Sequence, residues 1–287
     1  MPYNSMSKGE KRMKKRFLAL LSVIAMVLSV GCNQMKICFV CLEIKSVDSS
    51  DTCAACLEEM SEMEYIEEGG CLSLKGMGAC TSSVIAVPSK VDGMSVKYVA
   101  KLAFENDKHL ERVLIGGGIT AIEIGAFQGC YNLREVKFKL GLTRIDSAAF
   151  KDCSSIKKLS LPSTIITIGE SAFENCTDLK SVSIPKSVLT LSECAFYGCG
   201  SLESVSCSNG LKTIGFFAFY KCSSLKKISI PSSVDEIGFN AFSACVNLTN
   251  ITFKGTKAEW DEVNKYREWC TGAPATVVHC TDGDVEN

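Results

Sequence analysis

Large apolar residues recur along most of the chain at a fixed interval of 23 residues. An Ala-Phe pair marks each copy, and the seven phenylalanines are Phe104, Phe127, Phe150, Phe173, Phe196, Phe219 and Phe242. From the second copy on, a cysteine follows three residues after the phenylalanine, and a leucine or isoleucine follows three residues after that. This repetition predicts a solenoid, in which each unit buries its apolar face against its neighbours.

The segment after each leucine or isoleucine alternates apolar and polar residues, as in Ile156–Leu161 and Leu225–Ile230. Alternation with a period of two predicts a half-buried strand. Pro162, Pro185 and Pro231 close three of these segments, and proline suits the end of a strand because it cannot donate to a ladder. We therefore expect one strand per repeat, and stacking should align these strands in a parallel sheet.

The unit I-P-S-x-V-x-x-I-G-x-x-A-F-x-x-C-x-x-L-x-x-I-x-I resembles the BspA-like leucine-rich repeat family, most clearly from Ile230 to Cys245. The resemblance covers about residues 85–253. It implies an α/β-type repeat solenoid with a parallel β-sheet on one face and mostly irregular loops on the other. We expect the solenoid and its N-terminal cap over residues 63–255, and a C-terminal cap over residues 256–287.

A basic and then apolar segment at the front of the chain predicts export. Residues 11–16 read KRMKKR, and residues 17–30 carry no charge. This pattern is typical of a signal peptide, here residues 1–31. The apolar stretch is shorter than the ~20 residues that a transmembrane helix needs.

The end of this segment, Leu28 to Cys32, resembles a bacterial lipobox. The resemblance implies a lipid attached to Cys32, and it implies that Met13 is the true start and residues 1–12 an upstream over-call. An acylated Cys32 would hold the protein on a membrane without spanning it. The expected location is then the bacterial cell envelope, at the cell surface, and plain secretion is the alternative.

Net charge argues against nucleic acid as a partner. The signal peptide holds six basic residues and one acid, so 25 basic and 31 acidic groups remain, a net charge of −6. Nucleic-acid binding needs a basic footprint.

The 17 cysteines fall into groups by position. Those of the repeat column, and Cys207 in a strand position, should be buried thiols without disulfides. Stacked strands lie ~4.8 Å apart, whereas a disulfide needs a Cβ separation of about 3.8 Å. Cys194 lies in a loop position, and Cys270 and Cys280 could close a short loop in the C-terminal cap.

Residues 32–62 form a Cys-rich segment with two C-x-x-C pairs, Cys38 with Cys41 and Cys53 with Cys56. After an export signal the pairs favour disulfides, with zinc ligation or unstructured thiols as alternatives. These four residues are weak candidates for a metal site, and no cofactor is expected.

The motifs of the common enzyme classes do not occur in the sequence. There is no G-x-S-x-G, H-E-x-x-H, Walker A or dinucleotide fingerprint, each of which places a nucleophile, a metal or a phosphate. The two histidines, His109 and His279, lie in a repeat loop and in the cap. We therefore expect a protein that is not an enzyme.

Two surfaces are candidates for partner binding. The outward strand positions form a serine-rich, mildly basic face, which is either a binding platform or an ordinary solvated face. Phe216 and Phe239 lie in a loop column with further aromatic residues, which either form an exposed apolar patch or tuck into the coil edges. The candidates on the strand face are Arg112, Lys137, Lys158, Ser160, Ser183, Ser206, Lys227 and Ser229.

The family resemblance implies adhesion, that is, binding of protein or glycan partners on host or neighbouring cells by a membrane-anchored extracytoplasmic protein. Two alternatives remain at this stage. One is a structural or envelope-assembly lipoprotein, and the other is a metal or redox protein that works through the C-x-x-C pairs.

Overall fold

A computed structural model describes residues 63–78 and 82–286. The predictions for the signal peptide, the lipid attachment at Cys32 and the C-x-x-C pairs from Cys38 to Cys56 lie outside the described residues.

The described chain begins with an antiparallel hairpin of β1 (Glu64–Glu68) and β2 (Cys71–Gly76). Gly69 and Gly70 make its turn, with φ of 57° and 79°, a conformation that glycine adopts without strain. Strand β2 pairs with β5 (Met94–Val99) in parallel, so this end of the stack carries an antiparallel strand in place of a bare repeat edge.

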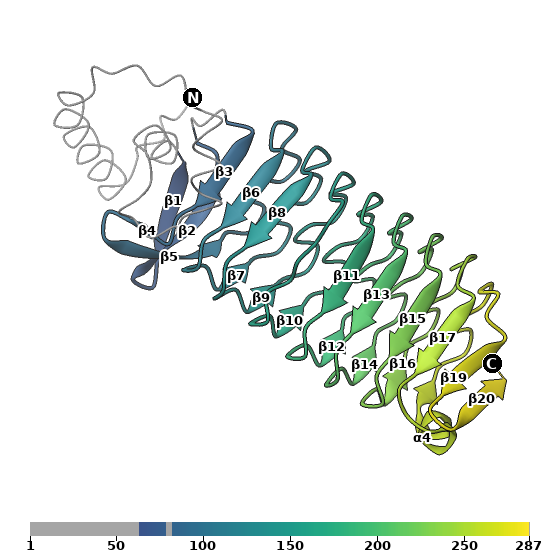
Figure 1. The fold of residues 1–287 in the computed structure, drawn as a ribbon. Coiled ribbons are helices and arrows are strands. Elements are labelled where there is room, and N and C mark those ends of the chain that lie inside the picture. The colour runs from purple at the N-terminus through teal and green to yellow at the C-terminus, as the bar shows by residue number, and fades with distance from the viewer. Residues whose placement is uncertain (1–62, 79–81, 287) are drawn as a thin grey trace, which may run out of the picture.

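Strands from successive repeats build the predicted parallel face of the solenoid, except in the repeat that contains residues 158–161 (Figure 1). The face consists of two sheets, one of β3 (Val84–Val87), β6 (Arg112–Ile115) and β8 (Glu135–Phe138), and one of β11 (Ser181–Ile184), β13 (Ser204–Cys207), β15 (Lys227–Ile230), β17 (Asn250–Phe253), β19 (Val277–Cys280) and β20 (Gly283–Glu286). From β6 to β8, and from β11 to β17, paired residues are 23 positions apart, as Ser183 and Ser206 are, so the pairing register in these strands follows the repeat period.

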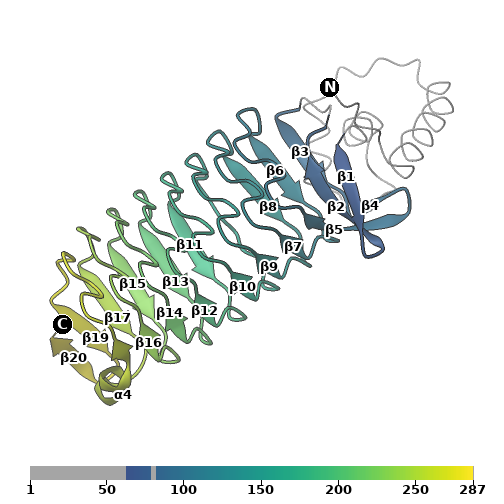
Figure 2. The ribbon, with the colours of Figure 1, turned by 180° about the vertical axis from the view of Figure 1, so that it is seen from behind.

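A second ladder of very short strands runs along the solenoid, beside the first (Figure 2). The family resemblance predicts mostly irregular loops on this face. Besides β1, β2, β4 (Lys90–Val91) and β5, this sheet contains β7 (Ala121–Ile122), β9 (Arg144–Ile145), β10 (Thr167–Ile168), β12 (Thr190–Leu191), β14 (Thr213–Ile214), β16 (Glu236–Ile237) and β18 (Asn264–Lys265). From β9 to β16, each of these strands contributes one buried side chain to the core, such as Ile168 or Leu191.

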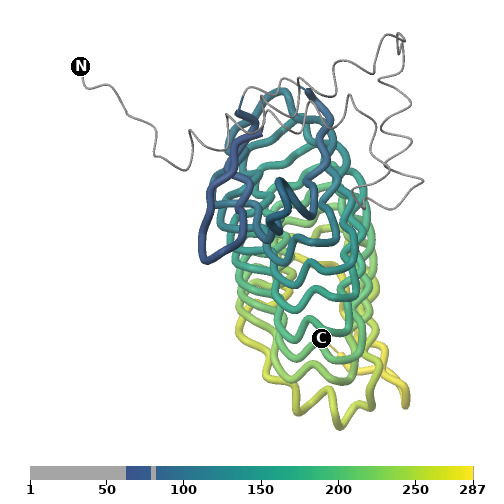
Figure 3. Tube along the Cα trace, turned by 90° about the vertical axis from the view of Figure 1, so that its left-hand side faces the viewer, coloured from purple at the N-terminus to yellow at the C-terminus, as the bar shows by residue number. Residues whose placement is uncertain are grey.

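The repeated Ala-Phe and cysteine positions form the core between these ladders. Figure 3 shows successive coils stacked along the solenoid, and neighbouring phenylalanine rings stack with centroids 4.9–5.5 Å apart. The phenylalanine N–H donates to the alanine carbonyl of the next coil, as Phe173 does to Ala195 at 2.9 Å. The alanine side chain is fully buried, which agrees with a position where two backbones approach closely.

The repeat cysteines are buried thiols, as predicted. Each Sγ donates to the phenylalanine carbonyl of the preceding coil, for example from Cys153 to Phe127 at 3.0 Å and from Cys199 to Phe173 at 3.2 Å. Cys207 is buried and Cys194 half-buried, also as expected.

The strand face is interrupted where a strand is expected at 158–161. No backbone hydrogen bond joins Lys158–Leu161 to β8 or β11 among the described residues. At the equivalent end of β8, the Lys139 N–H donates to the Ile115 carbonyl at 3.0 Å. Pro162 and Pro185 occupy that donor position in two successive coils. Because proline has no N–H, the equivalent hydrogen bonds on both sides of residues 158–161 cannot form.

Helix α4 (Lys257–Glu262) and the hairpin of β19 with β20 close the C-terminal end. A capping box joins Thr256 and Glu259 at the start of the helix, and its hydrogen bond lowers the pKa of the Glu259 carboxyl. Trp260 is buried against Phe253, with ring centroids 5.1 Å apart. This aromatic contact covers the last coil.

The suggested link between Cys270 and Cys280 is wrong, because the structure contains neither residue in a disulfide. Cys280 lies on β19, paired with Gly283 across a tight hairpin. The hairpin and the docked helix hold the cap without a covalent closure.

Candidate ligand-binding surface

The outward serines of the predicted face meet side by side in the C-terminal sheet. Ser183 pairs with Ser206, and Ser206 pairs with Ser229, in one unbroken register. Lys227 pairs with Ser204 in the same sheet. The buried residues between these positions, such as Val182 and Ile228, confirm the predicted alternation.

The interruption of the strand face opens a groove of about 700 Å³. It lies beside β8, and it contains four of the predicted strand-face candidates: Arg112, Lys137, Lys158 and Ser160. Its apolar lining includes Val136 and Phe138. Phe138 is only half-buried, although it occupies an inward position that isoleucine fills in β6 and β11. The groove has six cationic side chains, which are Arg112, Arg134, Lys137, Lys139, Lys157 and Lys158.

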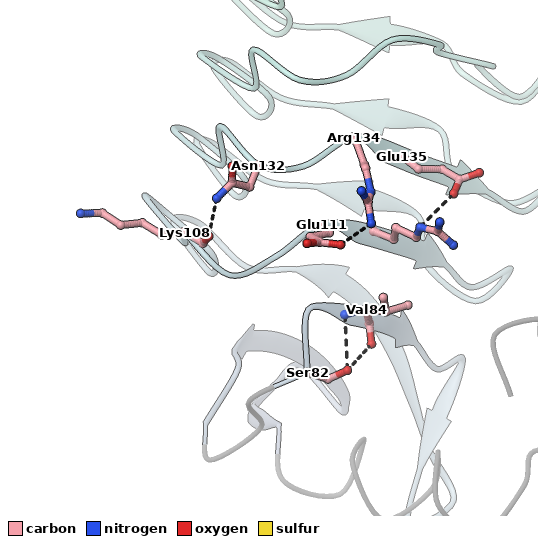
Figure 4. A network of polar contacts seen from close by, with 8 residues as sticks. Ser82, Val84, Lys108, Glu111, Asn132, Arg134 and Glu135 are labelled. Atoms are coloured by element: carbon pink, nitrogen blue, oxygen red, sulfur yellow. Dashed lines mark hydrogen bonds and ion pairs between the residues drawn. The ribbon is translucent and has the colours of Figure 1, made fainter. Parts of the chain in front are cut away.

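Carboxylates pair with three of these six cations, and Figure 4 shows the pair of Arg134 with Glu111. Arg134 forms an ion pair with Glu111. Glu135 lies 3.6 Å from Arg112 and 3.4 Å from Lys137. Two carboxylates therefore form ion pairs with three cationic side chains.

The other three cations of the groove are not neutralised in this way. Within the part of the chain that the structure describes, Lys139, Lys157 and Lys158 have no carboxylate partner. Elsewhere on the face, the Glu203 carboxylate pairs with two lysines. Its oxygens lie 3.9 Å from Lys180 Nζ and 3.6 Å from Lys226 Nζ. The groove is therefore a local positive site on a protein whose net charge is negative.

The aromatic column lies apart from the groove, in the turns that follow β14 and β16. Phe217 contacts both Phe239 and Tyr220 edge-on, with ring centroids 5.6 Å apart in each pair. Phe216 is 39% exposed and packs against Tyr266 of the C-terminal cap. The column therefore partly tucks into the coil edges and partly faces solvent.

The two histidines lie at different ends of the described solenoid, His109 before β6 and His279 on β19. His109 is exposed in a turn, and His279 Nδ1 lies 2.9 Å from the Asp284 carboxylate across the terminal hairpin. The described residues contain no group of three or more side chains that could hold a metal ion. Over residues 63–78 and 82–286, no helix has the length and hydropathy to cross a membrane.

Comparison with known proteins tests the resemblance carried by the repeats. A family model described as "BspA type Leucine rich repeat region" matches residues 88–180 and 143–263, with 6 copies. The chain belongs to this family. None of the curated proteins matches it.

Solved structures agree with this assignment. The leucine-rich repeat protein TpLRR of T. pallidum is 26% identical, with a TM-score of 0.61, and the match covers 65% of this chain and 88% of that protein. A leucine-rich repeat protein of Bacteroides ovatus is 19% identical, with a TM-score of 0.56, and the match covers 77% of this chain and 70% of that one. These likenesses confirm the solenoid, and family membership indicates a repeat protein with a binding role.

Phe138 and Lys139 are groove residues that the sequence did not predict as site residues. Their only signal is a departure from the repeat consensus, since Ile184-Pro185 and Ile230-Pro231 fill the same two positions in other copies, and only Phe253-Lys254 repeats the pair. Lys157 is recognisable as a strand-face cation, but its lack of a carboxylate partner depends on the contacts of the folded chain.

Proposed function

We propose that this protein is an exported binding protein, anchored to the bacterial envelope through Cys32, that recognises protein or glycan partners through the strand face of its solenoid. The groove beside β8 is the observation that carries the proposal, because an open face with unneutralised lysines offers both shape and charge to a partner. Binding would be spread over several coils, which is how solenoids use their extended surfaces.

The strand face can be tested with matched substitutions on three coils. Ser160, Ser183 and Ser206 are all exposed on the strand-face side. Replacing the three with glutamate should reduce capture of a partner from host-matrix or bacterial-surface extracts by the full-length protein, because the new charges repel anions and alter the contact surface. Capture is measured by pull-down and quantitative mass spectrometry.

The control places the same substitution on the same coils in the second ladder, at Thr167, Thr190 and Thr213. We expect this variant to capture the partner as the parent does. Equal losses in both variants, or no loss in the first, would exclude the strand face as the binding surface. Protease treatment of intact cells adds a second arm, since protection of the protein would favour the envelope-assembly alternative.

A separate prediction concerns the proposed lipid anchor at Cys32. Labelled palmitate should be incorporated into the full-length protein in a bacterial host and should be absent from the Cys32→Ser variant, because the lipid is attached through that thiol. A variant that still takes up label would show that Cys32 is not the attachment point.

A further inference from the structure

We propose that the groove beside β8 binds an anionic polysaccharide, which contributes its carboxylate or sulfate groups to Lys139, Lys157 and Lys158. This inference rests on the proposed function and narrows its partner to one chemical class. It draws on three properties of the groove, which are its uncompensated charge, its half-buried aromatic ring and the arrangement of the backbone around it.

Charge is the first property. Lys139 follows β8, and Lys157 and Lys158 lie on the next coil, so the three ammonium groups come from adjacent levels of the stack. Adjacent strands lie ~4.8 Å apart, which is close to the length of one sugar ring. A linear chain with charges on successive or alternate sugars can therefore reach cations from neighbouring coils.

The second property is the combination of an apolar ring with polar groups. Phe138 lies in the groove lining and is only half-buried, and its ring is fixed edge-on against Phe150 with centroids 6.1 Å apart. The exposed Ser160 hydroxyl lies in the same lining. A sugar presents an apolar face, hydroxyl groups and, in an acidic polysaccharide, a charged substituent. The groove offers a partner for each of these features.

The third property argues against a peptide that adds as a strand. The chain's own segment at 158–161 occupies the place beside β8 where the next strand would lie. The buried side chains of Ile156 and Leu159 anchor this segment. A peptide would have to displace this segment to pair with β8, because strand addition requires an open edge. Recognition in this groove therefore depends on side chains, which suits a flexible charged polymer.

The chain offers a matched pair of double variants. Lys157 and Lys158 precede Leu-Ser-Leu, and Lys226 and Lys227 precede Ile-Ser-Ile at the same positions three repeats later. Lys226 and Lys227 do not line the groove, and Lys226 is paired with Glu203. Replacing either pair with serine removes the same charge from the same strand positions.

The experiment measures binding of the full-length protein to heparin, hyaluronan, neutral dextran and poly-L-glutamate by titration at low salt. Heparin or hyaluronan should bind, and the Lys157→Ser/Lys158→Ser variant should bind about tenfold more weakly. The Lys226→Ser/Lys227→Ser variant should bind within about twofold of the parent. Binding should weaken as salt is added, because exposed charges are screened. Thermal unfolding of both variants confirms that the fold is kept.

Several outcomes would overturn the inference. Equal losses in both double variants would indicate binding by general charge, and equal binding of dextran would exclude the lysines as determinants. Poly-L-glutamate that binds as tightly and depends on Lys157 and Lys158 would assign the groove to an acidic protein segment. Absence of polyanion binding, with partner capture still lost in the strand-face variant, would reject the polysaccharide and leave the proposed function standing.

Discussion

At alkaline pH the solenoid should unfold, because its core contains thiols that ionise only in the unfolded chain. Desolvation by burial raises the pKa of Cys199, Cys207 and Cys245 to about 12, from an ordinary value of 9.0. The same cause raises the pKa of three further thiols well above 9.0, those of Cys153, Cys176 and Cys222. A buried thiolate would lie in an apolar environment that stabilises charge poorly.

The direction follows from proton binding in the two states. Below pH 9 these thiols are protonated in both states and do not affect the free energy of unfolding. Above pH 9 the unfolded chain releases protons that the folded chain keeps until about pH 12, so stability falls as the pH rises. Each thiol removes about 1.4 kcal/mol per pH unit. Six of them remove roughly 8 kcal/mol per unit, which is comparable with the whole stability of a typical domain.

Urea unfolding of the reduced protein at pH 7, 8, 9 and about 10 measures this slope. The Cys199→Ala variant isolates one thiol, since other groups that titrate in this range are unchanged. Its slope above pH 9 should be smaller than that of the parent by about 1.4 kcal/mol per pH unit. Cys71→Ala is the control, because Cys71 lies in the terminal hairpin outside the stacked column. Identical slopes for Cys199→Ala and the parent would disprove the account.

These core residues were predictable from sequence because of the period alone. In a solenoid, residues 23 positions apart must become neighbours, so the recurrence of Phe173 and Phe196 or of Cys176 and Cys199 already specifies their contacts. The pairing of Ser183 with Ser206 follows for the same reason. A repeat converts a one-dimensional spacing into a three-dimensional register without knowledge of the backbone.

The second ladder was not predictable in this way. Its strands have two residues each, as in Thr167–Ile168, and alternation cannot be recognised over such a short segment. The interruption at 158–161 was also missed, because the segment keeps the apolar pattern of a strand. It results from prolines in two successive coils, Pro162 and Pro185, and each proline alone is compatible with a strand end.

The candidate site could be predicted from sequence only in part, for a different reason. Sequence identified the strand face and several of its cations, including Lys137 and Lys158, because the outward positions follow from alternation. It could not show which cations remain unneutralised, since Glu111 and Glu135 form their ion pairs across coils. The charge of a surface depends on these pairings, and a residue count does not contain them.

Replacing Phe173 with alanine should cost about 3–5 kcal/mol of stability, the range for large-to-small changes at buried aromatic positions. Phe173 is fully buried and stacks between Phe150 and Phe196, with centroid distances of 5.4 and 5.3 Å. The substitution leaves a cavity and removes both stacking contacts, each worth about 0.5–1.5 kcal/mol within that total. Urea unfolding at neutral pH, where the thiols are protonated in both states, measures the loss.

The control uses a phenylalanine whose surroundings differ. Phe216 is 39% exposed and contacts the ring of Tyr266, so Phe216→Ala should cost less than about 1 kcal/mol. Phe173→Leu should recover part of the loss, because it refills most of the cavity but cannot stack. Since each coil is stabilised mainly by its neighbours, hydrogen exchange in Phe173→Ala should accelerate first in the coils around residues 150–196. Equal costs for the two alanine variants would mean that the phenylalanine stack does not hold the coils together.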